Sequence, residues 1–186
     1  EAATVSVGTV TTGEPGSNAQ VTNSGTENAA VLNFTIPRGA TGGSSPIQLL
    51  SAYSTPPQTG SGQTALIFDR NALVYGSAVS HANNSPNITI NQAGVYTLSF
   101  NGGFAPGSNV NFPLNVLTVA KLNGVTVPGA ATQQSFHTSS DVVNQSFNVP
   151  IAVSTVPATL QIVSTGTAFL YSNIQVSLFR NGDIPT

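Results

Sequence analysis

Short apolar runs recur along nearly the whole chain, and their period is that of β-strands. In residues 94–104, GVYTLSFNGGF, the side chains of Tyr96, Leu98 and Phe100 alternate with smaller or polar residues. Clusters of Gly, Pro, Asn and Ser separate this run from its neighbours. No segment carries an apolar stripe with the 3.6-residue period of an amphipathic helix. The pattern therefore predicts an all-β protein.

The first part of the chain, residues 1–43, reads as a small β module. Its expected strands are TVSVGTV (4–10), AQVTN (19–23) and AAVLNFTI (29–36), and Pro37 ends the last of them. About forty residues are too few to bury a sufficient core. We expect this module to lean on a partner, which is either the following domain or copies of the module itself.

The second part, residues 44–186, contains many short strand candidates separated by turn signals at regular spacing. They are residues 47–53, 64–69, 87–90, 94–104, 112–122, 125–129, 147–154, 158–165 and 168–180. So many short strands favour a β-sandwich or a jelly roll. The dipeptide Asn123-Gly124 is the strongest hairpin signal in the chain.

Charged residues make up only 5% of the 186 residues, against about 25% in an average protein. Ser, Thr, Asn, Gln and Gly must therefore cover the surface, which suits an extracellular or particle-surface protein. The four basic residues are far apart, so the sequence argues against nucleic-acid binding. No apolar run is long enough to span a bilayer, so membrane insertion is not expected. Cysteine is absent, which excludes disulfides and thiolate chemistry.

Four segments of the second part occur in the order of a known fold. They are NITINQAGVYTLSFNGGF (87–104), LTVAKLNGVTVPG (117–129), NVPIAVSTVPATLQIVST (148–165) and AFLYSNIQVSLFRNGD (168–183). Together they resemble the strands of the tumour necrosis factor-like (TNF-like) jelly roll. The resemblance covers most of residues 45–186 and implies a homotrimer.

The first part resembles a module found in collagen-like surface proteins of spore-forming bacteria and in phage fibre proteins, where FTIPRGATG is its usual end. With the jelly roll, the chain resembles a collagen-like exosporium glycoprotein of the BclA type. The collagen stretch is reduced to residues 39–42, so we interpret residues 39–46 as a flexible joint. The resemblance implies a trimeric, adhesive, non-enzymatic head of a spore or cell-surface fibre. The alternative is a phage fibre tip on the virion surface, and the implied partners are surface glycans or host-cell receptors.

One segment brings together residue types used in hydrolysis. His137, Ser139, Ser140 and Asp141 lie within five positions, but no G-x-S-x-G elbow accompanies them. A polar loop between strands explains them more simply. A glycosidase would need two positioned carboxylates, and acidic residues are scarce here. We therefore predict no catalytic residue and no enzymatic activity.

Metal ligands are also scattered in the sequence. His81 and His137 could form a pair, but two histidines without cysteines or clustered carboxylates make a weak site. Asp69, Asp141 and Asp183 could contribute to a calcium site, although calcium prefers several carboxylates close together. The sequence therefore predicts neither a metal nor a cofactor.

Aromatic side chains could stack on sugars if they lay on the surface. The chain has four tyrosines, Tyr53, Tyr75, Tyr96 and Tyr171. Tyr96 alternates with core residues and is expected inside, whereas Tyr171 lies opposite Leu170 and is a candidate for exposure. No glycan site can be located from this pattern.

The strand LNVLTVAKL (114–122) predicts a subunit contact. Its even-numbered positions, from Leu114 to Leu122, form an apolar face for the core. The opposite face is polar at its ends, but Leu117 and Val119 make its middle apolar. Exposed paired aliphatics are a liability on a monomer. We therefore expect Leu117 and Val119 to contact a neighbouring subunit of the trimer.

Overall fold

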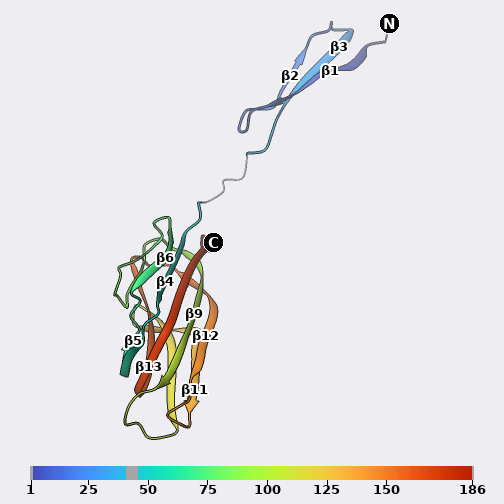
Figure 1. The fold of residues 1–186 in the computed structure, drawn as a ribbon. Coiled ribbons are helices and arrows are strands. Elements are labelled where there is room, and N and C mark those ends of the chain that lie inside the picture. Colours follow the sequence, from blue (N-terminus) through green and yellow to red (C-terminus); the bar gives the residue numbers. More distant parts are fainter. Residues whose placement is uncertain (1, 41–45, 186) are drawn as a thin grey trace. The chain divides into compact units, whose positions relative to one another are not determined.

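The computed structural model describes residues 2–40 and 46–185, and the chain divides into two compact units, Glu1–Ser45 and Pro46–Thr186 (Figure 1). Within these described residues there are strands and turns but no helix, so the all-β prediction is confirmed. Likewise, the described residues include no helix with the length and apolar character needed to cross a membrane. Most of the expected joint, namely residues 41–45, lies outside the described residues.

The first unit is a three-stranded sheet in the order β1-β3-β2. Its strands are β1 (Thr4–Gly13), β2 (Gln20–Asn23) and β3 (Ala29–Pro37). The central strand β3 runs parallel to β1 and antiparallel to β2. It ends at Pro37, which has no N–H to continue a ladder.

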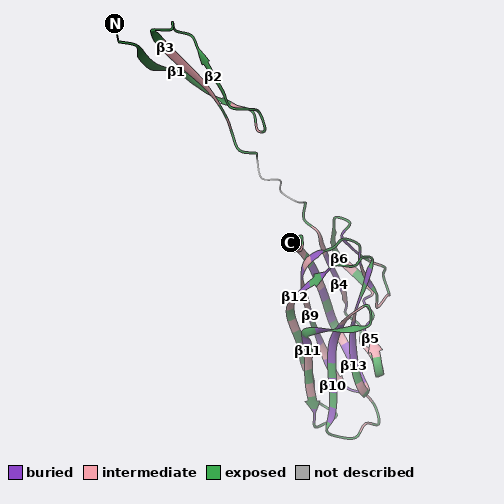
Figure 2. Cartoon of the chain, turned by 180° about the vertical axis from the view of Figure 1, so that it is seen from behind, coloured by how far each residue is buried: buried purple, intermediate pink, exposed green. Residues whose placement is uncertain are grey.

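The two faces of this small sheet differ in character. Residues paired across a sheet point to the same side, and the register places eight apolar side chains together. We call this side the apolar face; its apolar residues are Val5, Val7, Val10, Val21, Ala30, Leu32, Phe34 and Ile36, and the register also places Thr12 and Asn23 on it. The other side carries mostly Ser, Thr, Asn and Gln. Figure 2 shows all three strands in the colours of exposed and intermediate residues.

Ten strands build the second unit. They are β4 (Leu49–Ser54), β5 (Gln58–Ala65), β6 (Arg70–Tyr75), β7 (Val79–His81), β8 (Ile88–Ile90), β9 (Gly94–Pro106), β10 (Leu114–Leu122), β11 (Val125–Phe136), β12 (Val143–Val153) and β13 (Ala158–Gly182).

These strands form two layers joined by the long strand β13. Residues 158–166 of β13 pair with β8, β5 and β10, and β10 pairs with β11; we call this the β10 layer. After an irregularity between Gly166 and Phe169, β13 keeps β5 as a partner up to Tyr171 and pairs with β9 and β4, which continue to β12 and β6. We call this second group the β9 layer. The arrangement is the predicted β-sandwich.

Between the layers lies one hydrophobic core. Alternation along β9 sends Tyr96, Leu98 and Phe100 inward, and none of them is more than 2% exposed. Aromatic rings of neighbouring strands contact one another in this core, for example Phe104 of β9 and Phe169 of β13, with centroids 6.2 Å apart. Burial of so many large side chains stabilises the second unit.

Several strand boundaries differ from the sequence prediction. Strands β6 and β7 were not expected, and β13 is one continuous strand where two were predicted. The gap between the two predicted strands, 166–167, coincides with an irregularity inside β13 between Gly166 and Phe169. The Asn123-Gly124 hairpin prediction is confirmed, because both residues have positive φ, 49° and 82°, as a type I′ turn requires.

Candidate functional site

The loop of residues 137–141, between β11 and β12, is a closed turn. The Asp141 carboxylate accepts hydrogen bonds from the backbone N–H groups of His137 (2.7 Å) and Thr138 (3.0 Å). It also accepts one from the Thr138 hydroxyl at 2.7 Å. These bonds, led by the one from His137 N–H, lower the pKa of Asp141. The carboxylate therefore closes the loop, and its bonds do not orient the His137 ring.

His81 has a structural environment. Its Nδ1 lies 2.8 Å from Asn71 Oδ1, and its Nε2 lies 3.0 Å from the Ser85 carbonyl oxygen. The ring also meets Phe68 edge-on, with centroids 6.2 Å apart. Both ring nitrogens face protein oxygens, so His81 connects β7 to the neighbouring loop and strand.

The candidate calcium ligands are engaged separately. The Asp69 carboxylate lies 3.2 Å from the Arg70 guanidinium, and Asp183 forms an ion pair with Arg180. Asp141 is bound within its own loop. Among the described residues, no group of three His, Cys, Asp or Glu side chains could hold a metal ion.

The four tyrosines divide into two buried and two surface residues. Tyr96 is buried as expected, and its hydroxyl donates to the Gln92 carbonyl at 2.6 Å. The expectation of an exposed Tyr171 is wrong: it is 2% exposed, and its hydroxyl donates to Gln58 Oε1 at 3.0 Å. Burial raises the pKa of both buried phenols. Tyr53 is half-buried beneath the Arg70 guanidinium, and Tyr75 is 55% exposed.

Leu117 and Val119 differ in their exposure. Leu117 is 38% exposed, but Val119 is only 9% exposed because Ala131 and Val163 flank it in neighbouring strands. Lys121 reaches across β13 and donates to Gln63 Oε1 at 3.3 Å, which covers more of this side of the sheet. The chain itself therefore shields most of the apolar pair. The assignment of both residues to a subunit interface stays a prediction.

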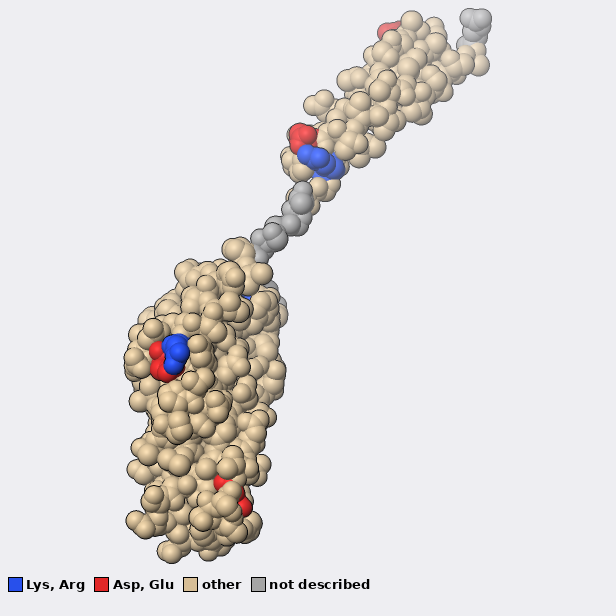
Figure 3. Space-filling model, viewed as in Figure 1, with Lys and Arg blue, Asp and Glu red and all other residues tan. Residues whose placement is uncertain are grey.

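The outward side of the β9 layer has a different composition. We call it the β9 face; it consists of Leu49, Ser51 and Tyr53 of β4, Gln175, Ser177 and Phe179 of β13, Thr97, Ser99 and Asn101 of β9, and Ser146, Asn148 and Pro150 of β12. None of these residues carries a charge; at the β6 side, the Arg70 guanidinium, paired with Asp69, lies over the Tyr53 ring. Figure 3 shows how few charged side chains the drawn side of the second unit displays.

Hydrogen bonds join neighbouring polar side chains of the β9 face. Gln175 Nε2 and Ser177 Oγ lie 3.1 Å and 3.3 Å from Ser51 Oγ. Asn148 Nδ2 donates to Ser99 Oγ at 2.9 Å. At one end of the face, the ring of Phe179 is 42% exposed. A surface of uncharged, hydrogen-bonded side chains with an exposed aromatic ring can meet another protein surface at low desolvation cost.

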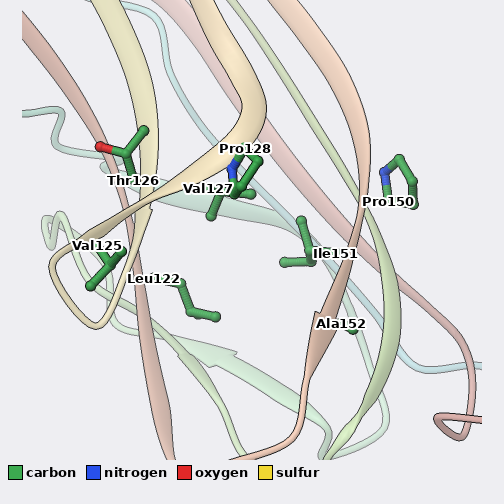
Figure 4. Close-up of a pocket in the computed structure, with 8 residues that line it drawn as sticks. All are labelled: Leu122, Val125, Thr126, Val127, Pro128, Pro150, Ile151 and Ala152. Atoms are coloured by element: carbon green, nitrogen blue, oxygen red, sulfur yellow. The ribbon is translucent and has the colours of Figure 1, made fainter.

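An apolar hollow of about 370 Å³ lies where the two layers part at the β11 and β12 edges (Figure 4). Its lining comes from the β10–β11 hairpin on one side and from β12 on the other: Leu122, Val125, Thr126, Val127, Pro128, Pro150, Ile151 and Ala152. Pro150 belongs to both the hollow and the β9 face, so the two surfaces are continuous.

Sequence reasoning missed the β9 face. The signal is present in β9, where Thr97, Ser99 and Asn101 alternate with buried residues. In the sequence, such positions look like ordinary solvent-facing residues. They are recognisable as one uncharged surface only when four strands are placed side by side.

Comparison of structures identifies the fold. The chain is similar to Eiger TNF from S. frugiperda, with a TM-score of 0.57 and 11% identity over 76% of this chain and 97% of that chain. It is also similar to murine APRIL at pH 5.0, with a TM-score of 0.53 and 12% identity over 72% and 99% of the two chains. The fold is therefore a TNF-like jelly roll, as predicted. No protein-family model and no curated protein sequence matches the chain.

Proposed function

We propose that the second unit is the homotrimeric head of an extracellular surface fibre and acts by adhesion, without catalysis. The β9 face carries this proposal. A three-fold assembly is heterologous, so one chain must offer two different surfaces that fit each other. The β9 face and the adjoining edge with its apolar hollow are two such surfaces.

The composition of the β9 face supports a permanent contact. Burial of charged groups is costly, and cores of stable interfaces are depleted of charge and enriched in aromatic residues. The exposed Phe179 ring and the uncharged rows beside it have this composition. The jelly-roll neighbours include two proteins of the TNF class. The trimer that this resemblance implies needs a subunit contact, and the β9 face is suited to that contact.

The structural roles of the polar candidates support a non-enzymatic head. The Asp141 oxygens are occupied by loop N–H and hydroxyl groups, and both His81 nitrogens face protein oxygens. A catalytic base would need a nitrogen or oxygen free to accept a substrate proton. The resemblance to BclA-type exosporium glycoproteins and the weakly charged surface favour the spore or cell surface as its site.

A second candidate is a phage fibre tip that binds a host glycan. Strand β6 is an edge strand, and three successive residues of it are about half exposed: Leu73, Val74 and Tyr75. An exposed Tyr beside aliphatic side chains offers a platform on which a sugar ring could stack. A glycan array probed with the full chain would favour this candidate if binding were lost in Tyr75→Ala.

The oligomeric state tests the main proposal. Multi-angle light scattering of the full chain at micromolar concentration should give three times the 18.9 kDa monomer mass. A monomer at that concentration would refute the trimeric head. Mass spectrometry of purified spores and of purified virions would then separate the two candidate locations.

A further inference from the structure

The first unit leaves its apolar face open. None of its described residues, 2–40, is buried, and the side chains of Val5 and Val7 are 71% and 69% exposed. Val10, Val21 and Ile36 are each 56% exposed. An amphipathic sheet of this kind is not stable by itself, because the burial that would offset chain entropy is missing.

On the opposite face, polar side chains form hydrogen bonds within the sheet. Asn33 Oδ1 accepts from the backbone N–H of Thr9 at 2.8 Å, and Asn33 Nδ2 donates to Ser24 Oγ at 3.0 Å. The hydroxyls of Thr11 and Thr35 lie 3.1 Å apart. One side of the sheet is therefore polar and suited to contact with water, whereas the other is apolar and suited to contact with an apolar partner.

We infer that the apolar faces of three copies pack on one another and enclose a common core, so that the first units of a trimer form a single β-prism. This inference rests on the proposed trimeric head. The occupant of each apolar face is the same face of the other two chains.

The lack of charge on the apolar face supports copies of the same chain as its occupant. Identical surfaces meet only where they carry no like charges, and the apolar face has none. Arg38 and Glu14 neutralise each other at 2.7 Å beside the Gly13–Pro37 end of the sheet. A partner protein recognised through charge would find no complementary groups on this face.

The small area of the apolar face supports an occupant that is already held close by other contacts. Strands β1, β3 and the four-residue β2, at about 3.3 Å per residue and spaced about 4.8 Å apart, give a face of roughly 360 Å². A stable complex between free partners buries about 800 Å² on each side. The face alone is therefore too small to capture a free protein.

A copy that is already linked to the same trimer needs less buried area to bind. Only residues 38–48 separate β3 from the first strand of the head. Joining the first unit to a trimeric head through so short a connection raises the effective concentration of its two sister units to about the millimolar range. The prism then forms as a consequence of head assembly.

The absence of cysteine allows a direct test by cross-linking. Val7→Cys places a thiol on the apolar face, and Ser6→Cys places one on the opposite face of the same strand. Under mild copper–phenanthroline oxidation of the full-length trimer, we expect Val7→Cys to form covalent dimers at least tenfold faster than Ser6→Cys. The rate should not change on tenfold dilution, because the reaction occurs within one trimer.

A second pair of variants reads out burial. Val7→Asp should raise hydrogen exchange of the β3 amides at least tenfold, whereas Thr22→Asp on the polar face should leave it nearly unchanged. Light scattering should show a trimeric head in both variants, since neither change touches the second unit.

The outcomes separate this inference from the proposed function. A monomer by light scattering would refute the trimeric head, and the prism with it. A trimer in which both cysteine variants cross-link equally slowly would overturn the prism alone. Strong β3 protection in a variant with monomeric heads would also overturn it, since the chain's own head or another surface would then cover the apolar face.

Discussion

A single charge on the β9 face should dissociate the proposed trimer. Ser99 lies in the middle of β9, between the buried residues Leu98 and Phe100, and points outward. Its sheet neighbours are Ser177 on β13 and Asn148 on β12, both of which can hydrogen-bond to a carboxylate. Ser99→Asp should therefore leave the monomer folded while placing one unpaired charge in each subunit interface.

The magnitude follows from three-fold symmetry. Burying an unpaired carboxylate at an interface costs about 3 kcal/mol, so the three sites of a trimer cost about 9 kcal/mol. At about 1.4 kcal/mol for each tenfold change, the trimer formation constant falls by roughly 10⁶. The midpoint concentration of trimer formation varies with the square root of that constant, so it should rise about 1,000-fold.

Sedimentation velocity over a concentration series measures this midpoint. Ser99→Asn is the neutral control of similar size and should remain trimeric. Leu117→Asp adds the same charge to the β10 layer and, if the β9 face is the interface, should also remain trimeric. An unchanged midpoint for Ser99→Asp would refute the reasoning. Loss of the trimer in Leu117→Asp would instead place the interface at Leu117 and Val119.

Two further predictions concern stability. The hydroxyls of Thr118 and Ser164 are buried and 2.8 Å apart, so Thr118→Val should cost about 1–3 kcal/mol by leaving Ser164 unpaired. The double variant Thr118→Val/Ser164→Ala should cost less than the sum of the single variants in urea unfolding, and strict additivity would contradict the coupling. The pKa of Asp141 is lowered in the folded chain, so its carboxylate stabilises the fold at pH values above the ordinary carboxyl pKa. This stabilisation is lost as the pH falls through the pKa of Asp141 in the folded state. Between about pH 5 and pH 2, wild type should therefore lose more stability than Asp141→Asn, and parallel urea midpoints would contradict this.

Alternation predicted the all-β class and most strands, because β-strands with one buried face repeat every two residues. It failed where a strand changes its surroundings. Strand β13 passes from one layer to the other near Gly166, and a glycine at such an irregularity looks like a turn in the sequence. Strand β6 has three exposed apolar residues in succession and shows no alternation.

Faces are harder to assign than strands. Leu170 and Tyr171 are both large, so alternation separates them without telling which one points inward; the structure buries Tyr171. Leu117 and Val119 share a face, yet only the pairing of β10 with β11 and β13 reveals that Val119 is covered. Inward and outward directions depend on contacts between strands that are distant in sequence.

The scarcity of charge also has a structural consequence for assembly. Each arginine of the chain is neutralised by an acidic residue of the same chain: Arg38 by Glu14, Arg70 by Asp69 and Arg180 by Asp183. Lys121 is bound to the uncharged Gln63. In a symmetric trimer every charge near the axis meets two copies of itself, so unpaired charges there are costly. A chain that pairs its arginines internally leaves the apolar face and the β9 face without unpaired charges, and such faces are the ones that identical copies can share.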